Sequence, residues 1–331
     1  MHSRSTLELP SGMKMTNHVG PVLVRVGDVE VIDCESCRFK HIFPLPTDEE
    51  VKKFYEEEFY QSEKPGYFDS YERDKEWWLD IVYGDRLKMM ESLLPSNDKR
   101  RVIDVGSGPG LFLEAAILRG WEQPLGIEPS KAAVEWSSRY WPKVFHGSLA
   151  QFIAERPPLG MASAIHLSEV LEHVKRPMEM LEHCYSLLAP GGLLCVTVPN
   201  DFSLFQKAYL RKNPSNAPWF VSPRHHLNYF DFPSLRSVLI RTGFHCVEKF
   251  FSSFPIDLNL SMFSGDYVKH PETGPAVHQD RIEFETALTH EERMHIYKYF
   301  AEAGIGREIT IIARKSPRSP FMSLPVPPGG E

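Results

Sequence analysis

Short apolar runs alternate with amphipathic segments from about residue 100 to about residue 315. The apolar runs have the length of buried strands, and the segments between them carry apolar residues at helical spacing. Such alternation is typical of an α/β fold in which helices cover a parallel sheet. We expect seven strands, at residues 100–106, 124–129, 143–148, 162–167, 193–199, 245–251 and 308–315.

Several of the expected helices have recognisable ends. Residues 110–120 form an amphipathic helix that ends at a glycine, and Ser130 can cap the helix after the second strand. Two more helices are expected over residues 177–188 and 291–305. The helices therefore fall between strands, as a sheet with crossover connections requires.

The first hundred residues follow a different pattern. Residues 22–37 alternate with period two, as a small antiparallel hairpin would, and Thr47 with Glu50 forms a capping box that opens a helix over 51–60. The aromatic-rich segment after it looks helical and can fold over the mouth of the sheet. We therefore divide the chain into a small N-terminal hairpin and helix module (1–60), a helical lid or linker (61–99), a main domain (100–315) with an insertion (252–305), and a proline-rich, disordered tail (316–331).

Composition and charge restrict the classes of function. The chain has 331 residues, 42% of them hydrophobic, which is enough for a large buried core. The net charge is -7 and there is no basic run, so a dedicated nucleic-acid binder is not expected. No stretch approaches the length of a membrane span, and the start lacks the apolar middle of a signal peptide. The five cysteines suit reduced thiols, so we expect a cytoplasmic protein with no membrane contact.

A glycine-rich loop follows the first expected strand. Glycines at a junction of strand and helix let a ligand approach the backbone and the start of the helix, so a nucleotide-like cofactor is the natural occupant. The dinucleotide fingerprint is not met, because its third glycine would fall at Leu111. Glu128, at the end of the second strand, is placed to accept hydrogen bonds from two ribose hydroxyls. The candidate cofactor residues of the loop are Asp104, Gly106, Ser107, Gly108 and Gly110.

Glu169, Glu172 and His173 bring two carboxylates and an imidazole to the end of the fourth strand. If the chain turns helical here, they occupy positions i, i+3 and i+4 and share one face. Such a set suits Mg²⁺, Mn²⁺ or Zn²⁺, with a further ligand from the distant His225 or His226; the alternative is that it only shapes the start of a helix. Without a metal, His173, His225 or His226 is a candidate general base.

Together these motifs resemble the class I S-adenosylmethionine-dependent methyltransferases. The matching pieces are VIDVGSGPG, GIEPS, EVLEHV and LLAPGGLLCVTVPN, in the family's order over about residues 100–315. The resemblance implies a Rossmann-like seven-stranded sheet with its last strand antiparallel. It also implies S-adenosylmethionine as cofactor, with its amino-acid part over the glycine loop and its ribose at Glu128.

The resemblance assigns further residues to the cofactor. Ser148 and Leu149 would contact the adenine, although His146 stands where many members carry an acidic residue. Arg86 resembles the arginine that reaches the cofactor carboxylate in ubiquinone-type enzymes, with a solvated charge on a helix as the alternative. Leu167 and Ser168, at the end of the fourth strand, complete the assignment.

The metal motif has a resemblance of its own. The pattern E-x-x-E-H with a later histidine is similar to that of the ubiquinone-pathway O-methyltransferases and of the small-RNA 2′-O-methyltransferases, where these residues hold a divalent cation. Carried over to this chain, the ligands are Glu169, Glu172, His173 and His226, with His225 as the alternative to His226.

Cys34 and Cys37 have the spacing of a zinc knuckle. They resemble part of the cysteine-rich module of many sugar- and polysaccharide-linked methyltransferases, which generally carry two such pairs. Residues 1–33 offer only His2 and His18 as further ligands. Because a structural zinc site needs four ligands, we expect a metal-free hairpin that is a degenerate form of a zinc ribbon.

The sequence therefore predicts transfer of a methyl group to a hydroxyl of a small polar metabolite, a sugar or a glycoconjugate precursor, with a divalent metal such as Mg²⁺ as an assisting group. The alternatives are a metal-independent N- or C-methyltransferase, an RNA 2′-O-methyltransferase, and a cofactor-binding subunit without activity. The acidic net charge argues against RNA. No feature of the sequence indicates an oligomeric state.

Overall fold

The computed structural model of the chain describes residues 18–55, 59, 66–95, 100–139, 143–155, 160–262 and 266–316. Within these residues, no helix has both the length and the apolar character that a membrane span requires. The expected disordered tail lies outside the described residues except for Ser316, and so do residues 56–58 and 60 of the helix expected over 51–60.

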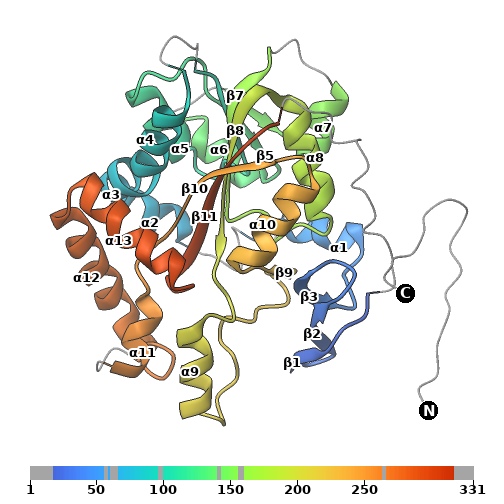
Figure 1. Cartoon of the computed structure of the whole chain (residues 1–331), viewed down its shortest axis with the longest axis vertical. Coiled ribbons are helices and arrows are strands. Elements are labelled where there is room, and N and C mark those ends of the chain that lie inside the picture. The colour runs from blue at the N-terminus through green and yellow to red at the C-terminus, as the bar shows by residue number, and fades with distance from the viewer. Residues whose placement is uncertain are drawn as a thin grey trace, which may run out of the picture.

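A seven-stranded sheet forms the centre of the main domain, in the order β10-β11-β8-β7-β4-β5-β6 (Figure 1). Strand β11 runs antiparallel to both of its neighbours, and the other pairings are parallel. The predicted Rossmann-like sheet with an antiparallel last strand is confirmed. The strands are β4 (Val102–Val105), β5 (Leu125–Glu128), β6 (Val144–His146), β7 (Ala162–Ser168), β8 (Leu188–Pro199), β10 (Cys246–Ser252) and β11 (Glu308–Arg314).

Helices cover both faces of this sheet. Alternate residues of β8 divide between two cores, with Leu194 and Val196 in one and Leu193 and Cys195 in the other. This is the period-two alternation of a strand that is buried on both sides. The first core includes α7 (Leu149–Glu155), α8 (Pro177–Leu187) and α10 (Phe232–Arg241), and the second includes α4 (Gly84–Leu93), α5 (Leu111–Leu118) and α13 (His290–Glu302), while α6 (Lys131–Ser137) lies beside β5 and β6.

The N-terminal module has its own small sheet. Strands β1 (Val22–Val26), β2 (Val29–Cys34) and β3 (Phe39–Phe43) form an antiparallel meander, and β9 (Asn228–Tyr229) of the main domain pairs with β3 as a fourth strand. The module therefore holds the chain segment that lies just before β9. The predicted capping box at Thr47 is confirmed and opens α1 (Asp48–Lys53), and Phe54 and Tyr55 continue it with π-helical geometry.

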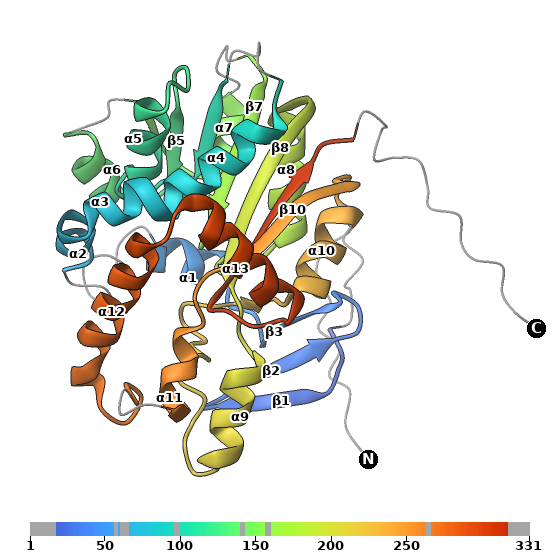
Figure 2. The ribbon, with the colours of Figure 1, turned by 60° about the vertical axis from the view of Figure 1, so that its left-hand side comes forward.

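Helices from the lid and from the insertion lie side by side (Figure 2). The lid consists of α2 (Tyr67–Arg73), α3 (Lys75–Trp77), a π-helical turn over Trp78–Tyr83, and α4. The insertion contains α11 (Asn259–Met262), α12 (Gly274–Ala287) and α13. Trp77 of α3 donates a hydrogen bond of 2.9 Å to the buried Glu285 of α12, which joins the two parts. Helix α9 (Leu204–Lys212) lies near the small sheet, before the segment that leads to β9.

Candidate functional site

A cavity of about 690 Å³ opens at the carboxyl ends of β4 to β7. Parallel sheets of this kind bind their ligands at that edge. One side of the cavity is formed by the glycine loop after β4 and the ends of β5 and β6. The other side is formed by α1, by the turn after β7 and by the segment before β9, which contribute Val51, Tyr55, His173, His225 and His226.

The glycine loop follows β4 with a tight reversal at Gly106. This residue has φ +72°, and a Cβ built on it would lie 2.4 Å from Cγ2 of Val170. Only glycine fits there, because a side chain would collide and would also strain the backbone. The hydroxyl of Ser107 is buried and has no hydrogen-bond partner among the described residues. A polar ligand at the loop would supply the missing partner.

Glu128 is fixed in orientation by the loop. Its two carboxylate oxygens accept hydrogen bonds from the backbone N–H of Gly108 (2.8 Å) and of Ser130 (2.9 Å). Burial is the main cause that raises the pKa of Glu128 to about 7, and the two backbone hydrogen bonds oppose it. Each oxygen keeps a second lone pair, so the predicted contact with two ribose hydroxyls is compatible with this geometry.

Arg86 belongs to a buried polar network and is not a solvated charge. Its guanidinium donates to the Ser168 hydroxyl at 2.9 Å and lies 3.4 Å from a carboxylate oxygen of Glu308. The imidazole of His166 donates from Nδ1 to Asp104 at 2.7 Å, and its Nε2 faces Arg86 at 3.4 Å. Burial lowers the pKa of His166, which favours this neutral form. Arg86 is therefore positioned at the cavity wall, where it can meet an anionic group.

Glu172, His173 and His226 meet at the other end of the cavity. The ligand atoms of these three side chains lie within 4.8 Å of one another. Glu172 is 1% exposed, and neither of its carboxylate oxygens has a hydrogen-bond partner in the described part of the chain. Burial first, and the nearby Glu169 carboxylate second, raise the pKa of Glu172 well above its ordinary value. A buried carboxylate in this state needs either a proton or a cation.

One of the two histidines is held by a hydrogen bond. His173 donates from Nδ1 to the backbone carbonyl of His225 at 2.6 Å, and its Nε2 lies 3.7 Å from Glu172 Oε1. The Nδ1 of His226 lies 3.5 Å from a carboxylate oxygen of Asp201 but has no hydrogen-bond partner among the described residues. His173, which is held through one ring nitrogen, presents the other as a defined ligand or base.

Two predicted ligands lie outside this cluster. The ring of His225 packs beside Phe54, with ring centroids 5.4 Å apart. Only its backbone carbonyl contacts His173, by accepting the hydrogen bond from Nδ1. Glu169 is exposed to the cavity and is absent from the set of mutually close ligand atoms. Desolvation by the surrounding protein is the first cause that raises the pKa of Glu169, and the charge of Glu308 is the second. Because the Glu169 side chain is exposed to the cavity, water screens part of this effect.

The chain does not turn helical through residues 169–173, so Glu169, Glu172 and His173 do not share a helical face. Glu169 has φ +54°, and a turn follows at residues 171–173 before α8 begins at Pro177. The carbonyl of Glu172 accepts hydrogen bonds from the N–H groups of Leu227 (2.7 Å) and Asn228 (2.9 Å). In a helix that carbonyl would pair four residues ahead, so the segment before β9 takes the place of the helical partner.

The cavity gathers most of the predicted cofactor residues. Arg86, Asp104, Gly106, Ser107, Gly108, Glu128, Ser148, Leu149 and Ser168 line it. Gly110 instead precedes the first residue of α5, and the Leu167 side chain is buried in the first core. Three further residues line the cavity and were not predicted from the sequence: Tyr55, His166 and Glu308. The signal for His166 was its position near the end of β7, and the signal for Glu308 was its position at the start of β11.

Comparison with known proteins identifies the family and supports the fold. The family model described as a methyltransferase domain matches residues 83–249, which is half of the chain. The chain belongs to the methyltransferase domain family. As the motifs predicted, it is a class I S-adenosylmethionine-dependent methyltransferase, and S-adenosylmethionine is its cofactor.

Curated relatives of this methyltransferase match over part of its length. A trans-aconitate 2-methyltransferase of Rhodopseudomonas palustris (strain BisB18) is 28% identical over 137 residues, which are 40% of this chain and 50% of the relative. The mitochondrial ubiquinone biosynthesis O-methyltransferase of Saccharomyces cerevisiae is 30% identical over 136 residues, 38% of this chain and 44% of the relative. The chain thus spans about half the length of the curated relatives it matches.

A solved structure supports the fold of the methyltransferase. The plantazolicin methyltransferase BamL, in complex with a triazolic desmethylPZN analogue and SAH, has a TM-score of 0.50 at 14% identity. The match covers 81% of this chain and 97% of that chain. At this identity the likeness extends to the fold alone.

Proposed function

We propose that this methyltransferase transfers the methyl group of S-adenosylmethionine to a hydroxyl of a small polar metabolite or sugar, with a divalent cation at the acceptor end of the cavity. One observation carries the proposal. The buried carboxylate of Glu172 has no hydrogen-bond partner among the described residues and lies beside His173 and His226. The glycine loop and Glu128 occupy the other end of the same cavity.

The residues present fit a divalent cation. One carboxylate and two imidazoles form a mixed oxygen and nitrogen set that Mg²⁺, Mn²⁺ or Zn²⁺ accepts. A cation there would neutralise the charge of Glu172, whose burial otherwise favours a bound proton. Glu169 stays a candidate further ligand, because its side chain is exposed to the same cavity.

The chemistry needs an aligned oxygen nucleophile. Methyl transfer requires the acceptor oxygen, the methyl carbon and the sulfur to lie in line, so binding and orientation are the main task of the protein. A divalent cation held by Glu172, His173 and His226 would lower the pKa of the acceptor hydroxyl and fix its oxygen. With the cation in place, Nε2 of His173 is a ligand and the hydroxyl proton leaves to solvent. Without a cation, the lone pair on Nε2 makes His173 the candidate base.

The cavity and the relatives support a small polar acceptor. Near the three-residue cluster the wall carries the hydroxyl of Tyr55, which donates to the carbonyl of His225 at 2.8 Å. Lys175 and Arg176 also line the cavity and are both paired with Asp48, each at 2.8 Å. By its name one relative is an O-methyltransferase, and another acts on trans-aconitate. Free thiols at the described Cys34, Cys37, Cys184 and Cys195 agree with a cytoplasmic location, which we include in the proposal.

The test uses methyl-labelled S-adenosylmethionine and a cell metabolite extract, followed by mass analysis of the labelled products. The chain is first dialysed against a chelator and then assayed alone or with Mg²⁺, Mn²⁺ or Zn²⁺. We expect an O-methylated product, loss of turnover in the chelated sample, and unchanged binding of S-adenosylmethionine. Undiminished turnover after chelation would refute the metal, and a label on nitrogen or carbon would refute the hydroxyl acceptor. Tight cofactor binding without any labelled product would indicate a subunit without activity.

A further inference from the structure

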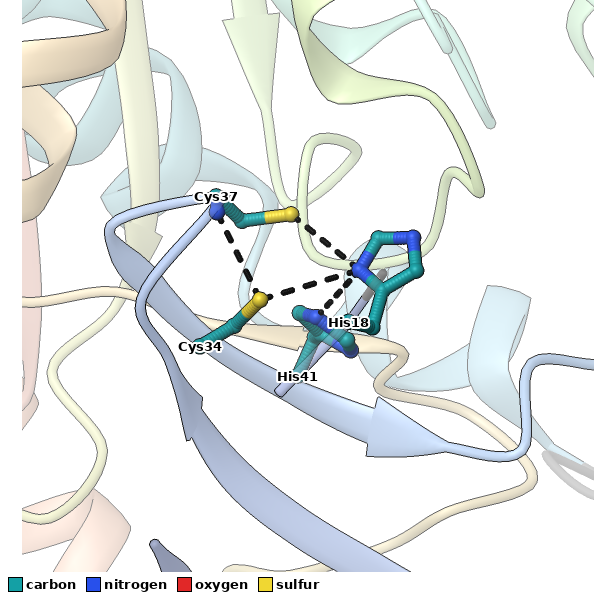
Figure 3. Close-up of side chains that lie close together, drawn as sticks. All are labelled: His18, Cys34, Cys37 and His41. Carbon is teal, nitrogen blue, oxygen red and sulfur yellow. Dashed lines mark hydrogen bonds between the residues drawn. The ribbon is translucent and has the colours of Figure 1, made fainter. Parts of the chain in front are cut away.

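The N-terminal module contains a second cluster of metal-ligating side chains, far from the cavity residues in sequence. His18, Cys34, Cys37 and His41 place four potential ligand atoms within 4.8 Å of one another (Figure 3). Nδ1 of His18 lies 3.0 Å from Nε2 of His41, 3.4 Å from Sγ of Cys37 and 3.7 Å from Sγ of Cys34. The two sulfurs and two nitrogens therefore converge on one point.

Local structure explains how these four residues come together. Cys34 ends β2, and the turn that follows has the backbone N–H of Cys37 donating to the Cys34 sulfur at 3.4 Å. Strand β3 then returns the chain so that His41 comes back beside the turn. His18 is brought in by the segment before β1, which the N–H of Glu35 holds through the carbonyl of Val19 at 2.9 Å.

The protonation states suit ligands. His41 donates from Nδ1 to the carbonyl of Ile42 at 2.7 Å, so that its Nε2 presents a lone pair to the cluster. Burial lowers the pKa of His18 and of His41, which keeps both rings neutral. Cysteines bind zinc as thiolates, so Cys34 and Cys37 would release their protons when the ion binds.

We propose that His18, Cys34, Cys37 and His41 bind a structural zinc ion. In a tetrahedral zinc site with bonds of about 2.3 Å to sulfur and about 2.0 Å to nitrogen, the ligand atoms lie roughly 3.3 to 3.8 Å apart. The distances around His18 Nδ1, from 3.0 to 3.7 Å, are close to that spacing. Four protein ligands leave no open position, so the site stabilises the module and does not take part in catalysis.

The zinc site would hold the acceptor end of the cavity in place. The carbonyl of Cys37 accepts a hydrogen bond of 2.7 Å from Arg241 of α10, and the Phe39 ring packs against Phe230 at 5.1 Å. In the pairing of β3 with β9, His41 lies opposite Asn228. Asn228 follows His226 by two residues along the chain. A zinc ion bound in the module would thus hold in place the segment that carries His226.

This proposal replaces the metal-free interpretation of the hairpin. That interpretation looked for the missing ligands only before Cys34 and found His2 and His18. The structure takes one ligand from before the pair and one from after it, at His41, four residues beyond Cys37. The signal was present in the sequence, since a C-x₂-C pair with a histidine on the next strand is compatible with a mixed cysteine and histidine site.

The test measures metal in the full chain, purified under reducing conditions without chelator. We expect about one zinc ion per chain by elemental analysis, and its release when a mercurial reagent titrates the thiols. Replacement of zinc by Co²⁺ should give the near-ultraviolet band of a cobalt–thiolate bond. This band separates the two metal sites, because Glu172, His173 and His226 offer no sulfur.

Variants then assign the ligands. Cys37→Ser and His41→Ala should lower the zinc content at least tenfold, whereas His18→Cys should keep the zinc and strengthen the cobalt–thiolate band. His270→Ala, which changes an exposed histidine outside the cluster, is the matched control and should behave as the parent chain. The proposal is overturned if the unaltered chain binds S-adenosylmethionine yet holds no zinc and shows no cobalt–thiolate band. That measurement does not depend on whether any variant folds.

Discussion

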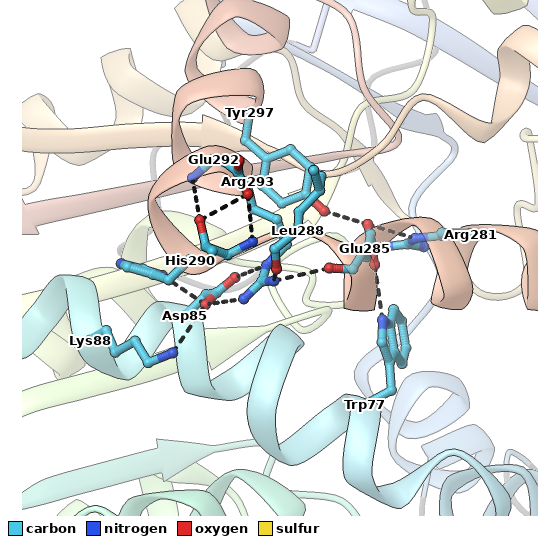
Figure 4. A network of polar contacts seen from close by, with 11 residues as sticks. Trp77, Asp85, Lys88, Arg281, Glu285, Leu288, His290, Glu292, Arg293 and Tyr297 are labelled. Atoms are coloured by element: carbon cyan, nitrogen blue, oxygen red, sulfur yellow. Dashed lines mark hydrogen bonds and ion pairs between the residues drawn. The ribbon is translucent and has the colours of Figure 1, made fainter.

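Asp85 of α4 and Arg293 of α13 form a buried, two-pronged ion pair that joins the lid to the insertion (Figure 4). The Arg293 guanidinium donates to the two oxygens of Asp85 at 2.7 and 2.9 Å, and both residues are nearly inaccessible to solvent. The next residue along α4 is Arg86, which lines the cavity. The insertion helix therefore helps to position an arginine at the cavity.

Replacing Arg293 by alanine should destabilise the fold strongly. The change leaves the Asp85 carboxylate buried with only partial compensation, a situation that costs about 3 to 5 kcal/mol. The free energy of unfolding, measured by denaturant titration, should fall by this amount. Arg73→Ala is the control, because Arg73 is exposed and its pair with Asp74 should contribute little to stability. Equal losses in the two variants would show that the buried pair has no special role.

The fold followed largely from the sequence because its strands are buried on both faces. The middle of β8, residues 193–196, is apolar without interruption, and glycines or capping residues mark the ends of helices between the strands. Whether residues 169–173 turn helical could not be predicted from the sequence, for the opposite reason. The carbonyl of Glu172 is bound by the N–H of Leu227, a residue 55 positions away, and the local spacing of side chains contains no trace of that partner.

The candidate site was predictable in its motifs and less so in its ligand sets. The glycine loop and Glu128 belong to one continuous strand-loop-helix-strand unit, so their order along the chain already places them together. Which of His225 and His226 meets Glu172 depends on how the segment before β9 enters the cavity. The same limit applies to His41, whose position beside Cys37 depends on the return of β3 next to β2.

Gly106→Ala should abolish binding of S-adenosylmethionine, because the new methyl group would collide with Val170 and displace the loop. Gly120→Ala is the matched control, since Gly120 also has a positive φ of +80° but an added Cβ meets nothing within 4 Å. Both variants pay the backbone cost of about 1 kcal/mol, and only the first should lose the cofactor in calorimetric titration. Adding Val170→Ala to Gly106→Ala should restore part of the affinity. Similar binding by the two single variants would contradict the proposed close contact.

Affinity for S-adenosylmethionine should fall on acidification through pH 7. Ribose hydroxyls donate to an ionised carboxylate, and the pKa of Glu128 in the free protein is raised to about 7. Below that pH the proton competes with the ligand, so the Kd should rise by about tenfold per pH unit. Calorimetric titration from pH 8 to 5.5 measures it. Glu128→Gln should bind weakly and without this pH dependence; a flat profile for the parent chain would remove Glu128 from the ribose contact.

The same shift has a consequence for stability. Since the pKa of Glu128 in the folded protein is above its ordinary value of 4.5, the folded state binds the proton more tightly than the unfolded state. Its stabilising contribution is therefore complete below pH 4.5 and is lost as the pH rises through about 7. Bound cofactor should offset this loss, because it uses the ionised form. Thermal unfolding with and without S-adenosylmethionine at pH 6 and pH 8 should show the larger ligand-induced shift at pH 8.

Of the two adjacent histidines before β9, only His226 should contribute its side chain to metal binding. His226 lies in the cluster with Glu172, whereas the His225 ring packs beside Phe54. His226→Ala should therefore weaken Mn²⁺ binding by at least about 10-fold, since loss of a group that only supports a ligand already costs about 10- to 100-fold. His225→Ala should leave Mn²⁺ affinity within about twofold, because its carbonyl still orients His173. Electron paramagnetic resonance of free Mn²⁺, recorded with the N-terminal module loaded with zinc, reports the affinity without requiring turnover. A larger loss in His225→Ala than in His226→Ala would reverse the assignment and make His225 the ligand.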